Sequence, residues 1–275
     1  MSASAGPPCI AFAHANSYPA ASYAPLLDLL RAEREVIAFP RFGHDPRFPV
    51  THRWPHLVDQ YRQWLEQQGR GPYLLIGHSL GGFLSLMVAE RAPELAAGVI
   101  LLDSPIIGGW KAVLLGTVQR TPLVWKFSPA RFAKVRRNHF PSLDEAFAHY
   151  RGKAVFRDFS DQALWHYVRA GTEPTPDATD GSLRLAFDRM EEARIYNGLP
   201  DHIPRVLKRL KAKRPDLPLA LLYGTRSAEA KTVGLAHSRR FIPADRIIPV
   251  DGTHLFPLER PDATAAALAH LWAGA

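Results

Sequence analysis

The sequence predicts an α/β protein in which helices flank a mostly parallel central sheet. Three observations carry this prediction: short apolar runs recur along the chain, helical patterns lie between them, and almost all of the runs are continuously apolar rather than alternating. Continuous apolar runs are typical of strands that are buried on both faces. Such strands occur in parallel sheets that are covered by helices on each side.

The apolar runs define the candidate strands. Each run is short, and turn-forming residues lie near several of its ends. The six candidates are residues 9–14, 35–39, 72–77, 98–102, 218–223 and 246–250.

The segments between the strands show helical patterns. Gly69 and Pro93 lie just after two of these patterns, where residues that end helices are expected. The four candidates in the sheet region are residues 22–32, 54–68, 80–92 and 262–273.

A long segment without a strand signal separates Asp103 from Pro218. It is too long for a loop and should carry its own structure. Its composition favours interrupted helices, for example residues 143–150, 161–170 and 203–212. We therefore predict a core formed by residues 1–104 and 216–275, with a helical cap at 105–215 inserted in it, rather than two separate domains.

The cap segment is also rich in aromatic residues. Residues 104–200 contain 13 of the 28 aromatic side chains, including Trp110 and Trp165. Ligands in open α/β sheets bind at the carboxyl edge of the strands, which an insertion after residue 103 would cover. We therefore expect the cap to gate an apolar pocket, although most of these rings will form the cap's own core.

The chain carries a net charge of +8, and the excess is uneven. Residues 104–143 contain seven basic residues and no acidic one, and residues 205–214 contain six more. Basic clusters can attract nucleic acids, anionic lipids or acidic ligands. Because no zinc-finger spacing or RNA-binding signature accompanies them, we expect a solvated basic surface and no nucleic-acid partner.

Cysteine content and hydropathy bear on the compartment. The single Cys9 excludes an intramolecular disulfide, and its apolar neighbours predict a buried thiol. The residues from Met1 to Pro8 lack the basic start and apolar stretch of a signal peptide. Residues 95–110 are interrupted by Asp103 and too short to span a bilayer. We expect a cytoplasmic protein without integral membrane association; nothing in the sequence indicates an oligomeric state.

The most informative motif is Gly-His-Ser-Leu-Gly at residues 77–81. An apolar strand runs directly into it, and a helical pattern follows. A strand-to-helix turn this sharp brings the backbones together, so Gly77 and Gly81 are required on either side of Ser79. The turn exposes Ser79 at the edge of the sheet, where amide dipoles of the following helix point at it. We predict that Ser79 is a nucleophile.

With this motif, the chain resembles the α/β-hydrolase superfamily, in particular the members with a cap inserted after the strand that follows the nucleophile. Three further segments match the family. Residues 14–19, His-Ala-Asn-Ser-Tyr-Pro, resemble its His-Gly-x-Pro segment. Residues 41–45 lie where the family has an Arg-Gly-His-Gly turn, and residues 252–259 resemble its Gly-x-His loop.

A serine hydroxyl needs a general base within hydrogen-bond reach. Of the 12 histidines, His254 follows the last predicted strand and fits the order of nucleophile, acid and base in this fold. His78 is next to the serine, but its side chain must leave the turn in another direction. His52 and His56 have helical spacing but lack a third ligand nearby, so we expect no metal site. Acyl transfer to water by a serine and a histidine requires no cofactor, so we expect none.

The acid that would complete a catalytic triad with Ser79 and His254 is assigned less directly. In the commonest version of the family the acid follows the penultimate strand in a Gly-x-x-Asp pattern, but here that pattern ends in Ser227. Other members carry the acid after the strand that follows the nucleophile, and Asp103 ends that strand here. A carboxylate there would orient the imidazole and stabilise the imidazolium. Asp103 is our assignment; Glu229, Asp251 and a site without any acid stay open.

The resemblance also implies an oxyanion hole. Its two backbone amides would belong to Leu80, in the nucleophile turn, and Asn16. Ala15 replaces the glycine that the family has at this point. We expect His14 to be structural rather than catalytic.

Together these residues predict hydrolysis of a carboxylic ester, of the carboxylesterase type, through an acyl-enzyme. A serine nucleophile argues against the epoxide-hydrolase and haloalkane-dehalogenase branches of the fold, which use aspartate. A serine-dependent C–C hydrolase or a thioesterase would use the same residues, and a non-catalytic ligand receptor would retain the same pocket. The expected partner is a small apolar ester or related acyl compound.

Overall fold

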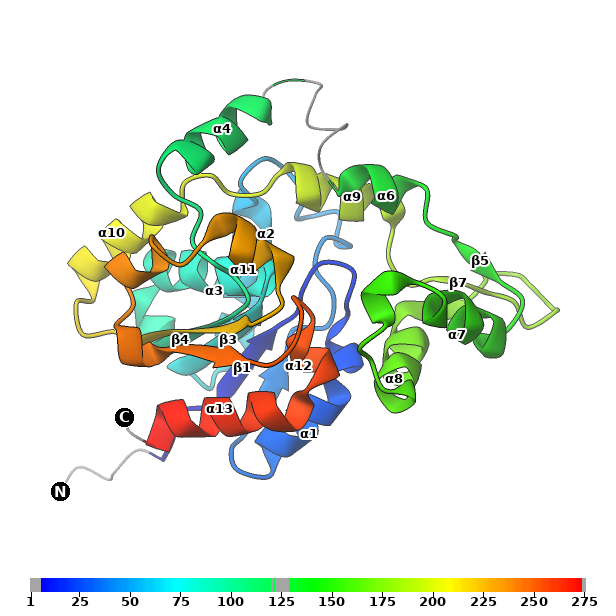
Figure 1. Cartoon of the computed structure of the whole chain (residues 1–275), viewed down its shortest axis with the longest axis horizontal. Helices are drawn as coiled ribbons and strands as arrows, with labels where there is room; N and C mark the ends of the chain where they lie inside the picture. The colour runs from blue at the N-terminus through cyan, green and yellow to red at the C-terminus, as the bar shows by residue number, and fades with distance from the viewer. Residues whose placement is uncertain (1–5, 120, 122–128, 274–275) are drawn as a thin grey trace.

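The computed structural model describes residues 6–119, 121 and 129–273 (Figure 1). At its centre is a six-stranded sheet in the order β2-β1-β3-β4-β8-β9, and every pair of neighbouring strands is parallel. The strands are β1 (Ile10–Ala13), β2 (Val36–Ala38), β3 (Tyr73–His78), β4 (Ala96–Leu102), β8 (Leu219–Gly224) and β9 (Ile247–Val250). All six predicted strands are present, and the predicted fold class is confirmed.

Helices cover both faces of this sheet, and each face has its own hydrophobic core. One core contains side chains of α2, α3 and α10; the other contains side chains of α1 and α13. Figure 1 shows α1 and α13 below the sheet. The helices of these layers are α1 (Ala24–Arg31), α2 (Pro55–Gln68), α3 (Leu80–Arg91), α10 (Ile203–Lys213), α11 (Ala228–Val233), α12 (Phe256–Glu259) and α13 (Pro261–Ala273).

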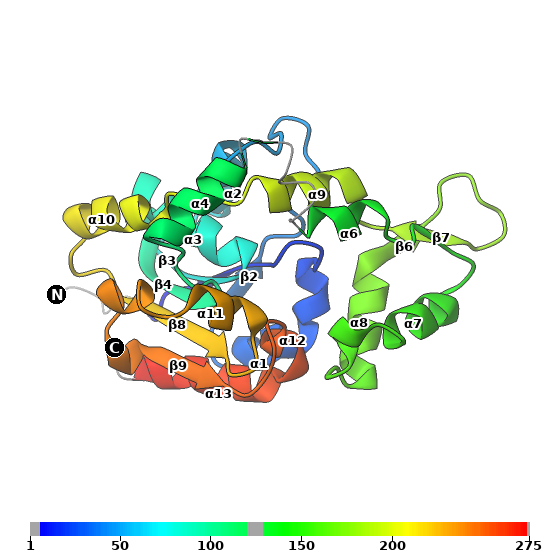
Figure 2. The ribbon, with the colours of Figure 1, turned by 45° about the horizontal axis from the view of Figure 1, so that its top comes forward.

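The segment between β4 and β8 forms most of the remaining structure. Its helices are α4 (Trp110–Val118), α6 (Ala130–Lys134), α7 (Leu143–Arg151), α8 (Asp161–Gly171) and α9 (Arg189–Asn197), followed by α10. Helices α6 to α9 lie to the right of the sheet in Figures 1 and 2, α4 lies above the sheet, and α10 lies at the left. Short 3-10 helices occur along the chain at Ala20–Tyr23, Pro93–Leu95, Ala154–Phe156, Ser238–Arg240 and Ala244–Arg246.

This segment also contains strands that the sequence did not predict. β5 (His139–Phe140), β6 (Thr172–Pro174) and β7 (Leu183–Leu185) form an antiparallel sheet in the order β5-β7-β6. Each strand has only two or three residues and mixes polar with apolar side chains, so none gives a continuous apolar run. The predicted interrupted helices are therefore accompanied by a small sheet that gave no strand signal in the sequence.

The last helix of the segment 105–215, α10, packs on α3, and its side chains Val206, Leu207 and Leu210 are buried. Several charged and aromatic residues of this segment lie outside the described part of the chain, namely Arg120, Trp125, Lys126 and Phe127. Among the described residues, no helix is long and apolar enough to cross a membrane.

The turn from β3 into α3 is very tightly packed. A Cβ atom on Gly81 would lie 2.1 Å from the backbone oxygen of Ala13, and a Cβ on Gly77 would lie 2.2 Å from the backbone of Gly81. Neither contact involves the end of a flexible side chain that could move aside. The two glycines therefore let the start of α3 approach both its own strand and β1.

We predict that Gly81→Ala destabilises the protein, because β1 and α3 would have to separate. The free energy of unfolding, measured by urea denaturation, should fall by about 1–3 kcal/mol or more. Gly152→Ala is the matched control, since a Cβ there meets only ordinary contacts at 3.7 Å. Equal stability of the two variants would contradict the packing described above.

Candidate active site

Ser79 lies at the junction of β3 and α3 in an unusual backbone conformation. Its φ of 52° and ψ of −110° are sparsely populated for a residue with a side chain. The turn is held from β4: the backbone N–H of Ser79 donates to the carbonyl of Leu102 at 2.9 Å, and the Ser104 hydroxyl donates to the carbonyl of Ser79 at 2.9 Å. Backbone strain that the surroundings enforce in this way is typical of functional sites.

His254 lies in the loop after β9 and is hydrogen-bonded to Asp103. Its Nδ1 donates to Oδ2 of Asp103 at 2.6 Å. Nδ1 therefore carries the proton of the neutral ring and Nε2 is the acceptor, which is the tautomer a general base requires. Burial by itself would lower the pKa of His254, but the Asp103 hydrogen bond and the charges of Glu229, Asp103 and Glu259 raise it above its usual value.

The Asp103 carboxylate is fully buried, and each of its oxygens accepts hydrogen bonds. Oδ1 accepts from the backbone N–H of Gly224 at 2.8 Å, and Oδ2 accepts from the Ser227 hydroxyl at 2.5 Å as well as from His254. A buried carboxylate is tolerated only when it is satisfied in this way. Ser227, at the position of the acid in the commonest version of the family, thus donates a hydrogen bond to Asp103.

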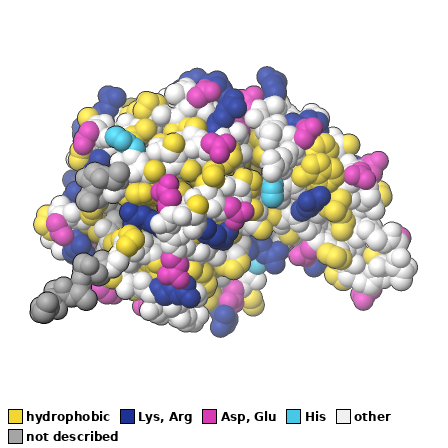
Figure 3. All heavy atoms as spheres, turned by 90° about the horizontal axis from the view of Figure 1, so that it is seen from below, with side chains coloured by type: hydrophobic (Ala, Val, Ile, Leu, Met, Phe, Trp, Pro, Cys, Tyr) yellow, Lys and Arg dark blue, Asp and Glu magenta, His cyan; other side chains and the backbone are white. Residues whose placement is uncertain are grey.

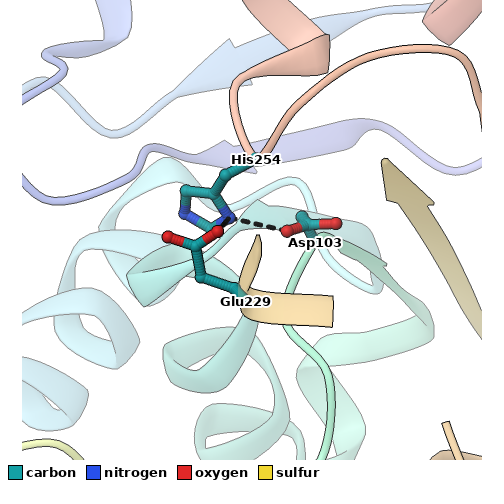
Figure 4. A group of neighbouring side chains, drawn as sticks. All are labelled: Asp103, Glu229 and His254. Atoms are coloured by element: carbon teal, nitrogen blue, oxygen red, sulfur yellow. Dashed lines mark hydrogen bonds and ion pairs between the residues drawn. The ribbon is translucent and has the colours of Figure 1, made fainter. Parts of the chain in front are cut away.

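Glu229 also lies close to the imidazole. Its carboxylate is 3.8 Å from Nδ1 of His254, but its side chain is 52% exposed. Figure 4 shows the imidazole with both carboxylates near it. The shorter contact and the complete burial favour Asp103 as the orienting acid, with Glu229 adding a longer-range charge. Asp251 pairs instead with Arg226.

Asp103, Glu229 and His254 are also residue types that bind metals, and one donor atom of each lies within 4.8 Å of the others. The oxygens of Asp103 are already occupied by the N–H and O–H donors of Gly224, Ser227 and His254. The arrangement is therefore that of an imidazole oriented by a carboxylate.

The two residues predicted to form the oxyanion hole, Leu80 and Asn16, line the same cavity as Ser79. Leu80 is the first residue of α3. Its backbone N–H is therefore one of the N–H groups of the first turn, which have no acceptor within the helix. Among the described residues, the backbone N–H of Asn16 has no hydrogen-bond acceptor, while its side-chain Nδ2 donates to the carbonyl of Glu192 on α9 at 3.1 Å. We call residues 14–19, which include Asn16, the oxyanion segment. It is hydrogen-bonded through Asn16 to α9, in the segment between β4 and β8.

His14 and His78 make structural contacts instead. Nε2 of His14 accepts from the backbone N–H of Phe42 at 3.1 Å, and burial lowers its pKa to about 4. His78 is buried, its Nε2 donates to the backbone carbonyl of His254 at 2.8 Å, and its Nδ1 accepts from the Tyr23 hydroxyl at 2.7 Å. His78 is therefore turned away from the cavity, as its place in the turn predicted.

Tyr23 is a residue that sequence reasoning missed. Its hydroxyl donates to His78 and accepts from the backbone N–H of Ala15 at 3.2 Å. It therefore connects the oxyanion segment, the nucleophile turn and, through His78, the His254 loop. Only the apolar helical pattern around Tyr23 is visible in the sequence; the partners lie 8 and 55 residues away.

All five predicted site residues line one cavity of about 750 Å³. Much of the wall is apolar and includes Trp54, Phe83, Ile107, Val155, Ile195 and Leu199. Trp110 and Trp165, which we expected to influence the pocket, do not line it: Trp110 is exposed, and Trp165 stacks on Phe147. Among the described aromatic residues of this segment, the one that lines the cavity is Tyr196 on α9.

Comparisons with known proteins identify relatives. A family model described as the alpha/beta hydrolase family matches residues 10–267. The chain is 25% identical over 216 residues to the (lyso)-N-acylphosphatidylethanolamine lipase of Mus musculus, and the match covers 72% of this chain but only 59% of the lipase. It is 34% identical over 73 residues to the probable thioesterase KK1J of Curvularia clavata, covering 22% of this chain and 24% of that protein.

The fold is also found among solved structures. An E-2-(acetamidomethylene)succinate hydrolase superposes with a TM-score of 0.75, at 22% identity, over 97% of this chain and 91% of that chain. A thioesterase domain from a curacin biosynthetic pathway superposes with a TM-score of 0.69, at 19% identity, over 95% of this chain and 90% of that chain. These likenesses show a shared fold.

We predict that Asp103→Asn impairs hydrolysis far more than Glu229→Gln. The amide cannot hold the His254 tautomer or stabilise the imidazolium, so kcat for a p-nitrophenyl ester should fall by about two to four orders of magnitude. Glu229→Gln should cost less than about tenfold, since an exposed carboxylate 3.8 Å away acts only through its charge. The reverse ranking would assign the acid to the later loop.

The raised pKa of His254 predicts a pH dependence. The base must be neutral, so kcat/KM should fall as the pH is lowered through an apparent pKa above the usual histidine value of about 6.5. Glu229→Gln should move this pKa downward, because it removes a negative charge that stabilises the imidazolium. Glu33→Gln, on the surface after α1, is the control and should leave the profile unchanged. A profile that does not respond to Glu229→Gln would contradict this role.

Proposed function

The chain belongs to the alpha/beta hydrolase family, and on this premise we propose that it is a serine hydrolase that cleaves carboxylic esters through an acyl-enzyme intermediate. One observation supports this most: a buried carboxylate holds the His254 imidazole in its basic tautomer on the wall of the cavity that Ser79 also lines. A serine on a strained turn beside such an imidazole can be deprotonated as it attacks.

In the first half of the proposed reaction, Oγ of Ser79 attacks the ester carbonyl carbon while Nε2 of His254 removes the hydroxyl proton. The negative charge on the carbonyl oxygen is stabilised by the N–H groups of Asn16 and Leu80. The imidazolium, stabilised by Asp103, then gives its proton to the leaving alcohol. The C–O bond breaks and the acyl group remains on Ser79.

In the second half, water takes the place of the alcohol. Nε2 of His254 removes a proton from the water as it attacks the acyl carbon, and the same donors stabilise the second tetrahedral intermediate. Return of the proton to Ser79 releases the carboxylic acid. No cofactor enters either half of the reaction.

We also propose that residues 105–215 act as a cap over the site. The supporting observation is that residues from both parts of the chain form the cavity wall, with Ile107, Val155 and Tyr196 from the inserted segment facing Ser79 and His254 from the core. The packing of α10 on α3 anchors the end of this segment to the sheet layer. The apolar wall favours an apolar acyl or alcohol portion of the substrate.

A thioester is the second candidate substrate. The specific observation in its favour is the match to a probable thioesterase over 73 residues. A thioester carbonyl needs the same nucleophile, base and oxyanion donors, so it differs only in the leaving group. Hydrolysis of a C–C bond would also use this serine and base, whereas a non-catalytic receptor would bind its ligand without turnover.

The proposal is tested with a panel of p-nitrophenyl esters from acetate to palmitate, with the thioester analogues in parallel. Wild-type protein should turn over part of the panel, and Ser79→Ala should reduce kcat by about 10⁵–10⁶-fold. Tyr196→Ala should shift the preferred chain length, because Tyr196 lines the cavity, whereas Trp165→Ala should not. Hydrolysis that survives in Ser79→Ala would contradict the proposal, and binding without turnover would favour a receptor.

A further inference from the structure

Two tyrosine side chains on the cavity wall have no part in the reaction proposed above. Tyr18 belongs to the oxyanion segment, two residues after Asn16, and Tyr196 lies on α9 in the inserted segment. Both line the cavity together with Asn16. Burial raises the pKa of Tyr18 well above its ordinary value, and the hydroxyls of Tyr167 and Tyr196 near it add to this. The two tyrosines therefore lie close together beside the predicted oxyanion donor.

The Tyr18 hydroxyl lacks a hydrogen-bond partner among the residues that the structure describes. It is not sealed off from solvent, unlike the unpartnered Oδ1 of Asn16. The Tyr18 ring is held in place by the ring of Tyr167 on α8, with their centroids 5.1 Å apart. A hydroxyl on a largely buried tyrosine normally has a partner. Because Tyr18 lines the cavity, its hydroxyl is open to a ligand there.

The Tyr196 hydroxyl offers a second donor. Burial and the charge of Glu192 raise the pKa of Tyr196 to about 12, while Arg136 and the Ser17 hydroxyl act in the opposite direction. Both tyrosines therefore keep their protons at neutral pH. A hydroxyl hydrogen can turn about the C–O bond, and a carbonyl oxygen has two lone pairs, so one such oxygen can accept from both tyrosines.

The group that these hydroxyls bind should be uncharged. Arg136, whose charge acts on both tyrosines, directs its N–H groups to Glu192, Tyr150 and Tyr167. It is therefore not free to pair with an anion, and a buried carboxylate without a cation is costly. The outer surface does not favour an ionic ligand either, because basic and acidic side chains are intermingled on the face shown in Figure 3.

We propose that Tyr18 and Tyr196 bind a second carbonyl oxygen in the acyl group, so that the substrates are esters of oxo acids. This rests on the reaction proposed above, in which Asn16 binds the ester carbonyl oxygen and His254 protonates the leaving alcohol. The alcohol must then lie against His254, whereas the tyrosines lie beside Asn16. The second carbonyl therefore belongs to the acyl portion.

The test measures binding to Ser79→Ala protein, so that the ester is not consumed. The probes are methyl octanoate and methyl oxooctanoates that carry the ketone at each carbon from the fourth to the seventh, and calorimetry gives the dissociation constants. Relative to methyl octanoate, at least one oxo ester should lose about three- to tenfold in affinity when Tyr18→Phe or Tyr196→Phe is added, because a neutral hydrogen bond is lost. Tyr223→Phe, on β8 and outside the cavity wall, is the matched control and should change neither affinity.

Methyl octanoate should bind equally to all of these variants, because phenylalanine keeps the ring, and thermal unfolding checks that each is folded. The proposal is overturned if no oxo ester binds, or if either cavity variant keeps the full affinity for every oxo ester. Equal losses for methyl octanoate, or for Tyr223→Phe, would also overturn it, since the hydroxyls would then not recognise the ketone. Because binding is read without turnover, failure here is distinct from failure of the proposed hydrolysis.

Discussion

The buried carboxylate of Asp103 is the group on which the site depends. It follows directly after β4, and its two oxygens accept hydrogen bonds from the end of β8, from the cap of α11 and from the His254 loop. A buried charge without partners costs several kcal/mol, so the hydrogen bonds to Asp103 hold these three segments in place around it. The same contacts fix the imidazole tautomer. Structure and chemistry therefore share one set of hydrogen bonds, and removing the charge affects both.

A second buried network holds the opposite side of the site. Tyr23 joins Ala15 to His78, and His78 joins the nucleophile turn to the backbone of His254. Burial lowers the pKa of His78 well below its usual value, so the ring stays neutral, with one nitrogen donating and the other accepting. These groups set distances between the oxyanion segment, the turn and the base loop.

Much of this arrangement could be predicted from the sequence. Continuous apolar runs indicate strands that are buried on both faces, and a Gly-x-Ser-x-Gly motif directly after a strand indicates a sharp turn into a helix. Asp103 could be named because it ends such a strand, and it does lie against His254. The role of Ser227 could not be predicted, since its partner is 124 residues away and local patterns carry no information on it. The short strands β5 to β7 were missed because they lack apolar runs. The exposure of Trp110 could not be predicted, because it depends on how α4 packs and not on the aromatic content of the segment.

Covalent labelling of Ser79 tests its role as the nucleophile most directly. Folded protein is incubated with a fluorophosphonate probe, and the adduct is mapped by mass spectrometry. We expect one adduct, on Ser79, that is abolished in His254→Ala and largely retained in His78→Ala, because His254 is the proposed base and His78 is not. No adduct, or an adduct on another serine of the folded protein, would contradict the assignment of Ser79 as the nucleophile.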